Sequence, residues 1–301
     1  MSSANIEAFQ TTEEAGAGAM KYKLTRRRFL GGCIAAGVGI AVDMRLVEPR
    51  WLRLASVNVP LPGVRLAHPI KIFHMSDMHA SGRIPASFIR KAIELGISQK
   101  PDLACITGDL ISRHIPDRSK YVENLSFLSA TCPCFACVGN HDGGRWVAPQ
   151  GGYRDVTEMR RLLDDSDVTL LFNSSREIAI KGNSIELVGL GDYWARDTKP
   201  SKAFPSNDDS HQTPRIVLSH NPDSKELLQK YTWDLMLCGH THGGQLSLPI
   251  VGTPFAPVDD HRYVYGLNQW DGRLIYTTRG VGNLHGLRFN CRPEVAILNL
   301  S

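Results

Sequence analysis

Residues 238–245 read CGHTHGGQ and directly follow the apolar run 235–237. His240 and His242 are two residues apart and are flanked by glycines. In a helix, residues at this spacing point in different directions, whereas at the end of a strand entering a tight turn both can face one pocket. Neutral imidazoles bind zinc, iron, manganese and similar ions. The stretch therefore predicts a metal site at the end of a buried strand, although an isolated His-x-His pair also occurs on exposed turns.

Four further polar clusters precede this stretch, and each follows a short apolar segment. In chain order they contain Asp77 and His79, then Asp109, then Asn140, His141 and Asp142, and finally His220. Ligand sites in open α/β sheets gather outside the carboxyl ends of the strands, so we expect these clusters to converge. They supply Asp, Asn and His but no Cys, a mixture that suits manganese, iron or zinc. The set is too large for one tetrahedral ion and fits two ions that share a carboxylate.

The pattern of apolar residues predicts a mixed α/β domain over residues 43–301. Strands are expected at 52–59, 69–73, 102–106, 134–138, 168–172, 176–180, 185–190, 215–218, 234–237, 263–267, 274–277 and 294–298, and helices at 84–97, 121–128, 153–164 and 222–230. Asp271 and Gly272 are typical of a hairpin turn. Residues 191–214 show little periodicity, and a loop of that length is usually functional or disordered. Early β-α-β alternation followed by hairpins indicates a layered α/β fold.

Taken in order, the motifs D-x-H, GD, GNHD, H and GHTH resemble those of the calcineurin-like metallophosphoesterases, and in particular a branch of exported bacterial phosphodiesterases. The resemblance covers residues 52–300. It implies a four-layer fold in which two mixed β-sheets pack face to face with helices outside. It also implies two divalent ions, either manganese, iron or zinc. One ion would be held by Asp77, His79 and His242 and the second by Asn140, His220 and His240, with Asp109 bridging the two.

The same resemblance assigns His141 a catalytic role. Two cations about 3.5–4 Å apart neutralise the developing charge on a phosphate and lower the pKa of a shared water. His141 would protonate the leaving oxygen or stabilise the transition state. The protein-phosphatase branch orients this His with an Asp in a GDxxDRG motif, but Ser112 stands at that position here. A protein phosphatase is therefore not expected, and Asp142 is our candidate for orienting His141.

The first 42 residues are not expected to belong to the catalytic domain. Residues 1–20 are small and polar and are predicted to be disordered. Arg26 and Arg27 precede an apolar run at 30–42, whose thirteen residues are too few to span a bilayer of about 30 Å. This pattern resembles a twin-arginine (Tat) export signal, which implies the Tat machinery as a partner and a location in the periplasm or on the outer face of the cytoplasmic membrane. No A-x-A cleavage site is visible, so an uncleaved, membrane-tethered form stays open.

Composition excludes few functions. The net charge is only +4, and no basic patch interleaved with aromatics appears, so nucleic-acid binding is not predicted. Cys105, Cys137 and Cys238 fall on apolar strands, where cysteine behaves as a small hydrophobe. A disulfide at Cys132 or Cys134 stays open. Arg279 and Arg288 fit phosphate contacts and structural pairing equally well, and His74, His114, His261 and His285 belong to no motif.

We therefore expect a metal-dependent phosphodiesterase. One alternative is a hydrolase of the pyrophosphate bond in a nucleotide-sugar lipid, since relatives with this metal site cleave UDP-diacylglucosamine. An apolar groove would favour that alternative, and Tyr193, Trp194 and Phe204 are candidates for its walls. The other alternative is a binding scaffold without catalysis. The complete set of expected ligands argues against the scaffold.

Overall fold

The computed structural model describes residues 25–204 and 213–301, so the segment 1–20, predicted to be disordered, lies outside the described residues. The chain forms two compact units, Met1–Ile40 and Ala41–Ser301. Helix α1 (Arg26–Val42) buries none of its side chains, and it continues into a π-helical turn, η1 (Asp43–Val47), and a 3-10 turn, η2 (Glu48–Arg50). By length and composition the helical run Arg26–Arg50 is able to cross a membrane, a test that an export signal also passes. The expectation that this segment is too short counted only its apolar run at 30–42, whereas the helix includes both flanks.

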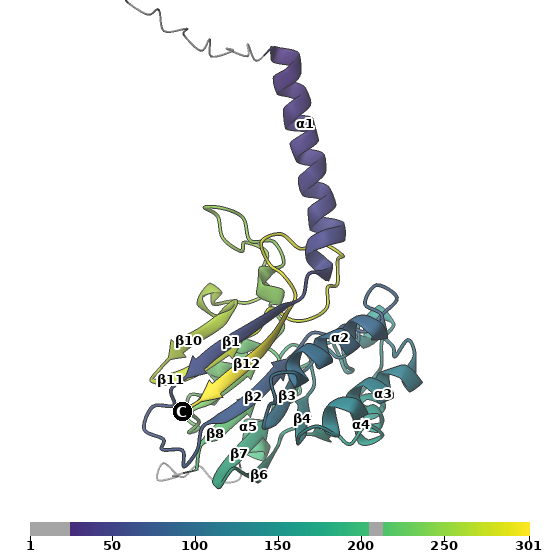
Figure 1. Cartoon of the computed structure of the whole chain (residues 1–301). Coiled ribbons are helices and arrows are strands. Elements are labelled where there is room, and N and C mark those ends of the chain that lie inside the picture. The colour runs from purple at the N-terminus through teal and green to yellow at the C-terminus, as the bar shows by residue number, and fades with distance from the viewer. Residues whose placement is uncertain (1–24, 205–212) are drawn as a thin grey trace, which may run out of the picture. The chain divides into compact units, whose positions relative to one another are not determined.

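Two six-stranded sheets form the larger unit (Figure 1). In the first sheet the order is β1 (Arg53–Val59), β12 (Glu294–Leu300), β2 (Ile70–Met75), β3 (Leu103–Thr107), β4 (Cys134–Cys137) and β5 (Thr169–Leu170). In the second it is β10 (Gly266–Trp270), β11 (Arg273–Thr277), β9 (Leu235–Cys238), β8 (Arg215–Leu218), β7 (Asn183–Gly189) and β6 (Ser174–Ile180). Both sheets are mixed. Strands β2 to β5 run parallel beside the antiparallel β12, and β7, β8, β9 and β11 run parallel between the antiparallel β6 and β10.

The sheets pack face to face because their strands alternate apolar side chains between two buried faces. On β3, Leu103 and Cys105 point between the sheets, whereas Ala104 and Ile106 point toward the helices. Helices α2 (Ala86–Ile97), α3 (Arg118–Ser129) and α4 (Thr157–Asp164) cover the outer face of the first sheet. The second sheet is covered by α5 (Pro200–Ala203) and the 3-10 helices η4 (Pro222–Leu228) and η6 (His261–Tyr263). The predicted four-layer α/β fold is confirmed.

One local prediction is wrong in part and two are confirmed. The strand predicted at 263–267 begins only at Gly266, because the Asp260 side chain accepts the Arg262 amide and starts η6. The helix predicted at 222–230 is present as the 3-10 helix η4, Pro222–Leu228. The hairpin is present as predicted, with positive φ at both Asp271 and Gly272, as a type I′ turn requires.

Six of the seven cysteines are buried packing residues, and Cys33 on α1 is exposed. All seven carry free thiols, so neither Cys132 nor Cys134 forms a disulfide. Cys105 and Cys137 lie between the two sheets, and Cys238 lies on the outer side of the second sheet. These positions match the expectation for small buried hydrophobes.

Candidate metal centre

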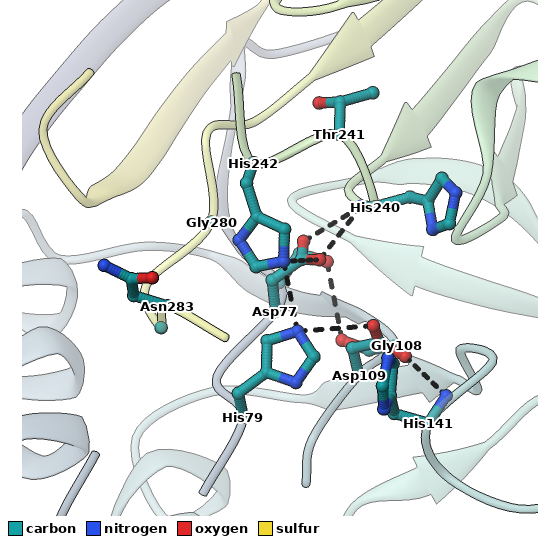
Figure 2. A network of polar contacts seen from close by, with 12 residues as sticks. Asp77, His79, Gly108, Asp109, His141, His240, Thr241, His242, Gly280 and Asn283 are labelled. Atoms are coloured by element: carbon teal, nitrogen blue, oxygen red, sulfur yellow. Dashed lines mark hydrogen bonds and ion pairs between the residues drawn. The ribbon is translucent and has the colours of Figure 1, made fainter. Parts of the chain in front are cut away.

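The carboxyl ends of β2, β3, β4, β8 and β9 meet at one place, and they bring the predicted ligands together. Figure 2 shows five of these ligands, Asp77, His79, Asp109, His240 and His242. The side chains that converge there are Asp77, His79, Asp109, Asn140, His220, His240 and His242, and none of them is more than 4% exposed. Strands β2 to β4 belong to the first sheet and β8 and β9 to the second. The site is therefore built across the seam between the sheets.

Asp109 lies between the contributions of the two sheets. Its Oδ1 accepts the His141 amide at 2.9 Å, which fixes the carboxylate. Its Oδ2 lies 3.4 Å from His79 Nε2 and 3.2 Å from His220 Nε2. One oxygen thus faces a histidine from each sheet, which is the arrangement a bridging carboxylate requires.

Two groups of ligand atoms surround this oxygen. On one side His79 Nε2 lies 3.1 Å from His242 Nε2, which lies 3.4 Å from Asp77 Oδ1. On the other side His220 Nε2 lies 3.2 Å from His240 Nδ1. The ligand atoms of Asp77, His79 and His242 all lie within 4.8 Å of one another, as do those of Asp77, Asp109 and His220. Asp77 therefore contacts both groups.

The residues present fit two divalent cations. Asn140 Oδ1 is buried and has no hydrogen-bond partner in the described part of the chain, an arrangement that is costly unless another group satisfies the oxygen. His220 Nδ1 donates to the Thr107 carbonyl at 2.8 Å, so Nε2, which faces Asp109, is the nitrogen that would bind a cation after losing its proton. Mixed imidazole, carboxylate and amide donors suit manganese, iron or zinc.

Burial keeps most of the imidazoles in the neutral form that binds metal. It lowers the pKa of His79 to about 3 and holds the pKa values of His240 and His242 well below their ordinary value. Burial alone would raise the pKa of Asp109, but His220 and other nearby histidines hold it well below its ordinary value. Burial alone would likewise lower the pKa of His220, but Asp109 raises it. In the absence of a cation, these two groups form a charged pair.

The backbone of the site is strained. Five of the converging residues have positive φ: Asp77 (52°), His79 (45°), Asp109 (50°), His240 (69°) and His242 (51°). A left-handed conformation costs a residue with a side chain roughly 1–3 kcal/mol and is typical of functional sites. The turns at the strand ends adopt it because it lets neighbouring residues aim their side chains into one cavity.

Two glycines of the motifs are required by close approach. A Cβ at Gly239 would lie 1.9 Å from Ser76 Oγ and 2.2 Å from Asp77 Oδ2. A Cβ at Gly139 would lie 2.2 Å from Asp109 Oδ1. Both glycines therefore let a backbone segment pass directly against a carboxylate of the site.

The prediction that Asp142 orients His141 is wrong. The His141 Nδ1 is 2.8 Å from the Ser112 carbonyl, and this contact orients the ring. The Asp142 carboxylate instead accepts the amides of Gly139 and Leu110, each at 2.8 Å. Burial raises the pKa of Asp142 to about 8. Asp142 thus braces the loops after β3 and β4 against each other.

Arg279, Arg288 and His74 make contacts within the protein. Arg288 is fully buried and donates to the carbonyls of Gly282 (2.6 Å) and Cys291 (2.9 Å), so it is not a phosphate contact. Arg279 lies over the Tyr265 ring. His74 is buried against the Thr107 hydroxyl.

A cleft of about 960 Å³ opens onto the site. His141, Asn140 and His240 line its floor together with Asp109. Its walls come mostly from loops outside the motifs, and they are lined by Arg83, Arg113, Trp146, Gln150, Trp194, Gln245, Leu246, Phe255, Leu284, His285 and Leu287. Of the proposed groove residues only Trp194 lines the cleft, with its ring centroid 4.2 Å from that of His240. Gln245 belongs to the motif at 238–245, and His285 was expected as a residue that could lie near substrate. The sequence did not indicate the remaining wall residues, because no local pattern marks a loop residue as part of a cleft wall.

Comparison with known proteins agrees with this geometry. The model of the family "Calcineurin-like phosphoesterase" matches residues 70–244. The chain is 46% identical over 285 residues to Phosphodiesterase YaeI of Escherichia coli (strain K12), covering 92% of this chain and 99% of that protein. It is 29% identical to UDP-2,3-diacylglucosamine pyrophosphatase LpxG of Chlamydia trachomatis, a match that covers 88% of this chain and 94% of that protein. It is 28% identical to the uncharacterized metallophosphoesterase YkuE of Bacillus subtilis, a match that covers 92% of this chain and 98% of that protein. The chain therefore belongs to the calcineurin-like phosphoesterase family.

Proposed function

We propose that this protein hydrolyses phosphodiesters at a dinuclear metal centre. The observation that carries the proposal is the single carboxylate oxygen of Asp109 that lies between His79 and His220, each with a second histidine beside it. The similarity to Phosphodiesterase YaeI over nearly the whole of both chains supports the diester as substrate. Asp77, His79 and His242 are the proposed ligands of one ion and Asn140, His220 and His240 of the other, with Asp109 shared.

The chemistry divides between the ions and the protein. Two divalent cations held by these residues would supply positive charge to the phosphate and would lower the pKa of a bound water. The His141 Nδ1–H donates to the Ser112 carbonyl, so its Nε2 is the nitrogen available to the cleft. In its protonated form, His141 gives a proton to the leaving oxygen as the ester bond breaks. The neutral histidines of the site hold their electron pairs for the ions.

The proposal extends to metal and location. Manganese is the first ion to test, because the donor set includes three oxygen-bearing side chains. The paired arginines at the start of α1, Arg26 and Arg27, and the apolar run that follows them support export by the Tat machinery. The protein would then act in the periplasm or on the outer face of the cytoplasmic membrane, with residues 43–301 as its catalytic domain and residues 1–42 as its signal segment.

The direct test compares two p-nitrophenyl esters. Protein loaded with manganese should cleave bis-p-nitrophenyl phosphate faster than the monoester, and Asp109→Ala and His141→Ala should each lose this activity. His141→Ala should retain its metal, whereas Asp109→Ala should not. Well-folded, metal-loaded protein that cleaves neither ester would reject the phosphodiesterase assignment.

A second candidate function is hydrolysis of a lipid-linked pyrophosphate. The apolar side chains in the cleft wall favour it, among them Leu246, Phe255, Leu284 and Leu287. The similarity to the pyrophosphatase LpxG, at 29% identity, supports the same chemistry. Release of UMP from UDP-2,3-diacylglucosamine, measured beside the diester assay, separates the two candidates.

A further inference from the structure

A short hairpin beside the cleft presents an apolar tip to solvent. Leu248 and Gly252 exchange backbone hydrogen bonds of 2.7 and 2.9 Å, which close the hairpin around Ile250 and Val251. These two side chains are 107% and 65% exposed, and Phe255, which also lines the cleft, is 68% exposed. Ile250 has a φ of 71°, an unfavourable conformation for a β-branched residue. The chain thus holds a fully exposed isoleucine in a strained turn at the mouth of its cleft.

The hairpin is tied to a second loop at the cleft mouth. The Ser247 amide donates to the Phe289 carbonyl at 2.8 Å, and the Phe289 amide donates to the Gln245 carbonyl at 2.9 Å. The loop that ends at Phe289 supplies Leu284 and Leu287 to the cleft wall. The hairpin and this loop therefore form a continuous border on one side of the cleft.

The segment that follows α1 is part of the same border. The Arg288 amide donates to the Met44 carbonyl at 3.0 Å, and the Arg45 guanidinium donates to the His285 carbonyl at 3.5 Å. We call residues 44–51, 246–255 and 284–290 together the cleft rim. The rim therefore begins only two residues after Val42, the last residue of α1.

Chain length limits how far the rim can lie from a membrane that holds α1. A residue spans at most about 3.6 Å, so Arg45 lies within about 11 Å of Val42 whatever the orientation of the helix. The helical run that begins at Arg26 is long and apolar enough to cross a bilayer. If its apolar part lies in a bilayer, the mouth of the cleft lies close to the lipid headgroups.

The exposed side chains of the rim suit that surface. Leu46, Val47 and Trp51 are 53%, 48% and 58% exposed, and they add to the apolar tip of the hairpin. Arg45 and Arg50 are also exposed on this segment. Tryptophan and basic residues beside apolar side chains are favoured where a protein meets a lipid surface with anionic headgroups.

We propose that the cleft rim docks on the surface of a lipid bilayer and that the phosphoester cleaved in the cleft is carried by a membrane lipid. This inference rests on the proposed function, because it assigns a substrate class to the same metal centre. The tip of the hairpin enters the interface, and the lipid headgroup reaches the metal centre from the bilayer without leaving it.

Two esters with the same leaving group test the proposal. The full-length, manganese-loaded chain is reconstituted in vesicles of phosphatidylcholine and phosphatidylglycerol. Hydrolysis of soluble bis-p-nitrophenyl phosphate is compared with that of a dialkylglycerol p-nitrophenyl phosphate in the same vesicles. We expect the double variant Ile250→Ser/Val251→Ser to lower the ratio of lipid to soluble rates by about tenfold or more, because two apolar side chains leave the interface. The matched control, Phe127→Ser, removes an exposed aromatic from α3, away from the cleft lining, and should leave the ratio unchanged.

A photoreactive lipid gives a readout that does not depend on activity. Phosphatidylcholine with a diazirine near its glycerol should label the peptide that contains residues 246–255 in the wild type, and much less in the double variant. Label confined to α1, or an unchanged rate ratio in the double variant, would overturn the docking proposal while leaving the phosphodiesterase intact. Labelling of the hairpin in a protein that cleaves neither ester would instead support docking and reject the proposed function.

Discussion

Replacing Gly139 by alanine tests whether the Asp109 carboxylate must lie where the structure places it. The added Cβ would lie 2.2 Å from Asp109 Oδ1, which is 1.2 Å inside the 3.4 Å at which ordinary contacts begin. The backbone nitrogen of Asp109 would lie 2.5 Å from the same Cβ, so the residue cannot simply rotate away. Metal ligands tolerate about 0.2 Å of displacement, and a misplacement of about 1 Å at a reacting centre costs on the order of 100-fold in rate. We therefore expect kcat/KM for the diester to fall by about 100-fold or more, equivalent to ~2.7 kcal/mol.

The assay measures metal content, diester hydrolysis and urea unfolding on the same preparations. Gly82→Ala is the matched control, because Gly82 also lines the cleft but has no atom within 4 Å of its added Cβ. Gly139→Ala should still fold, with a loss of about 1–3 kcal/mol from overpacking. A Gly139→Ala protein that binds two metal equivalents and retains activity within threefold of the wild type would refute the bridging role of Asp109.

Three further predictions concern residues around the site. Arg288→Met should lower the free energy of unfolding by about 3–5 kcal/mol, seen in urea titrations, because it removes a buried guanidinium that binds several carbonyls. Asp142→Ala should lower kcat, because the loop that carries His141 loses the hydrogen bonds from the Leu110 and Gly139 amides to Asp142. The shape of the pH–rate profile should not change. An altered profile would instead indicate an acid–base role for Asp142. Burial lowers the pKa of His74 from 6.5 to about 3, so unfolding takes up a proton below pH 6.5. The stability of the wild type relative to His74→Gln should therefore fall by up to ~1.4 kcal/mol per pH unit as the pH drops from about 6.5 toward 3. Equal pH slopes for the two proteins in chemical denaturation would contradict this.

Sequence reasoning succeeded for the fold because the central strands are apolar and end in polar residues. β3 and β9 are each followed by glycine and a polar side chain, so both the strand and its end are visible in the sequence. It failed at residues 263–265, where Tyr263 and Val264 are buried in a 3-10 turn and the turn after it. A run of two or three apolar residues has no periodicity that distinguishes a strand from a turn.

The candidate site divides in the same way. The residue types and the order of the motifs along the chain were sufficient to select the side chains that converge. Metal ligands must carry nitrogen or oxygen donor atoms, and His, Asp and Asn carry them. The contacts that orient His141 and Asp142 could not be predicted from the sequence, because backbone groups make them. The Ser112 carbonyl orients His141, and the amides of Leu110 and Gly139 bind Asp142, yet every residue carries such groups. The cleft walls were also missed, since Trp146 and Phe255 reach the cleft only through the paths of their loops.

The use of a carbonyl rather than a carboxylate beside His141 has a chemical consequence. The Ser112 carbonyl fixes the tautomer of the ring as the Asp of the GDxxDRG motif would, because either group accepts the Nδ1–H. A neutral carbonyl, however, adds no negative charge near the centre. Among the candidate ligands, negative charge would come only from Asp77 and Asp109, and an anionic phosphate would meet less repulsion as it enters. A centre of this kind favours a substrate that brings one negative charge to the metals and a leaving oxygen that needs a proton. A phosphodiester meets both conditions.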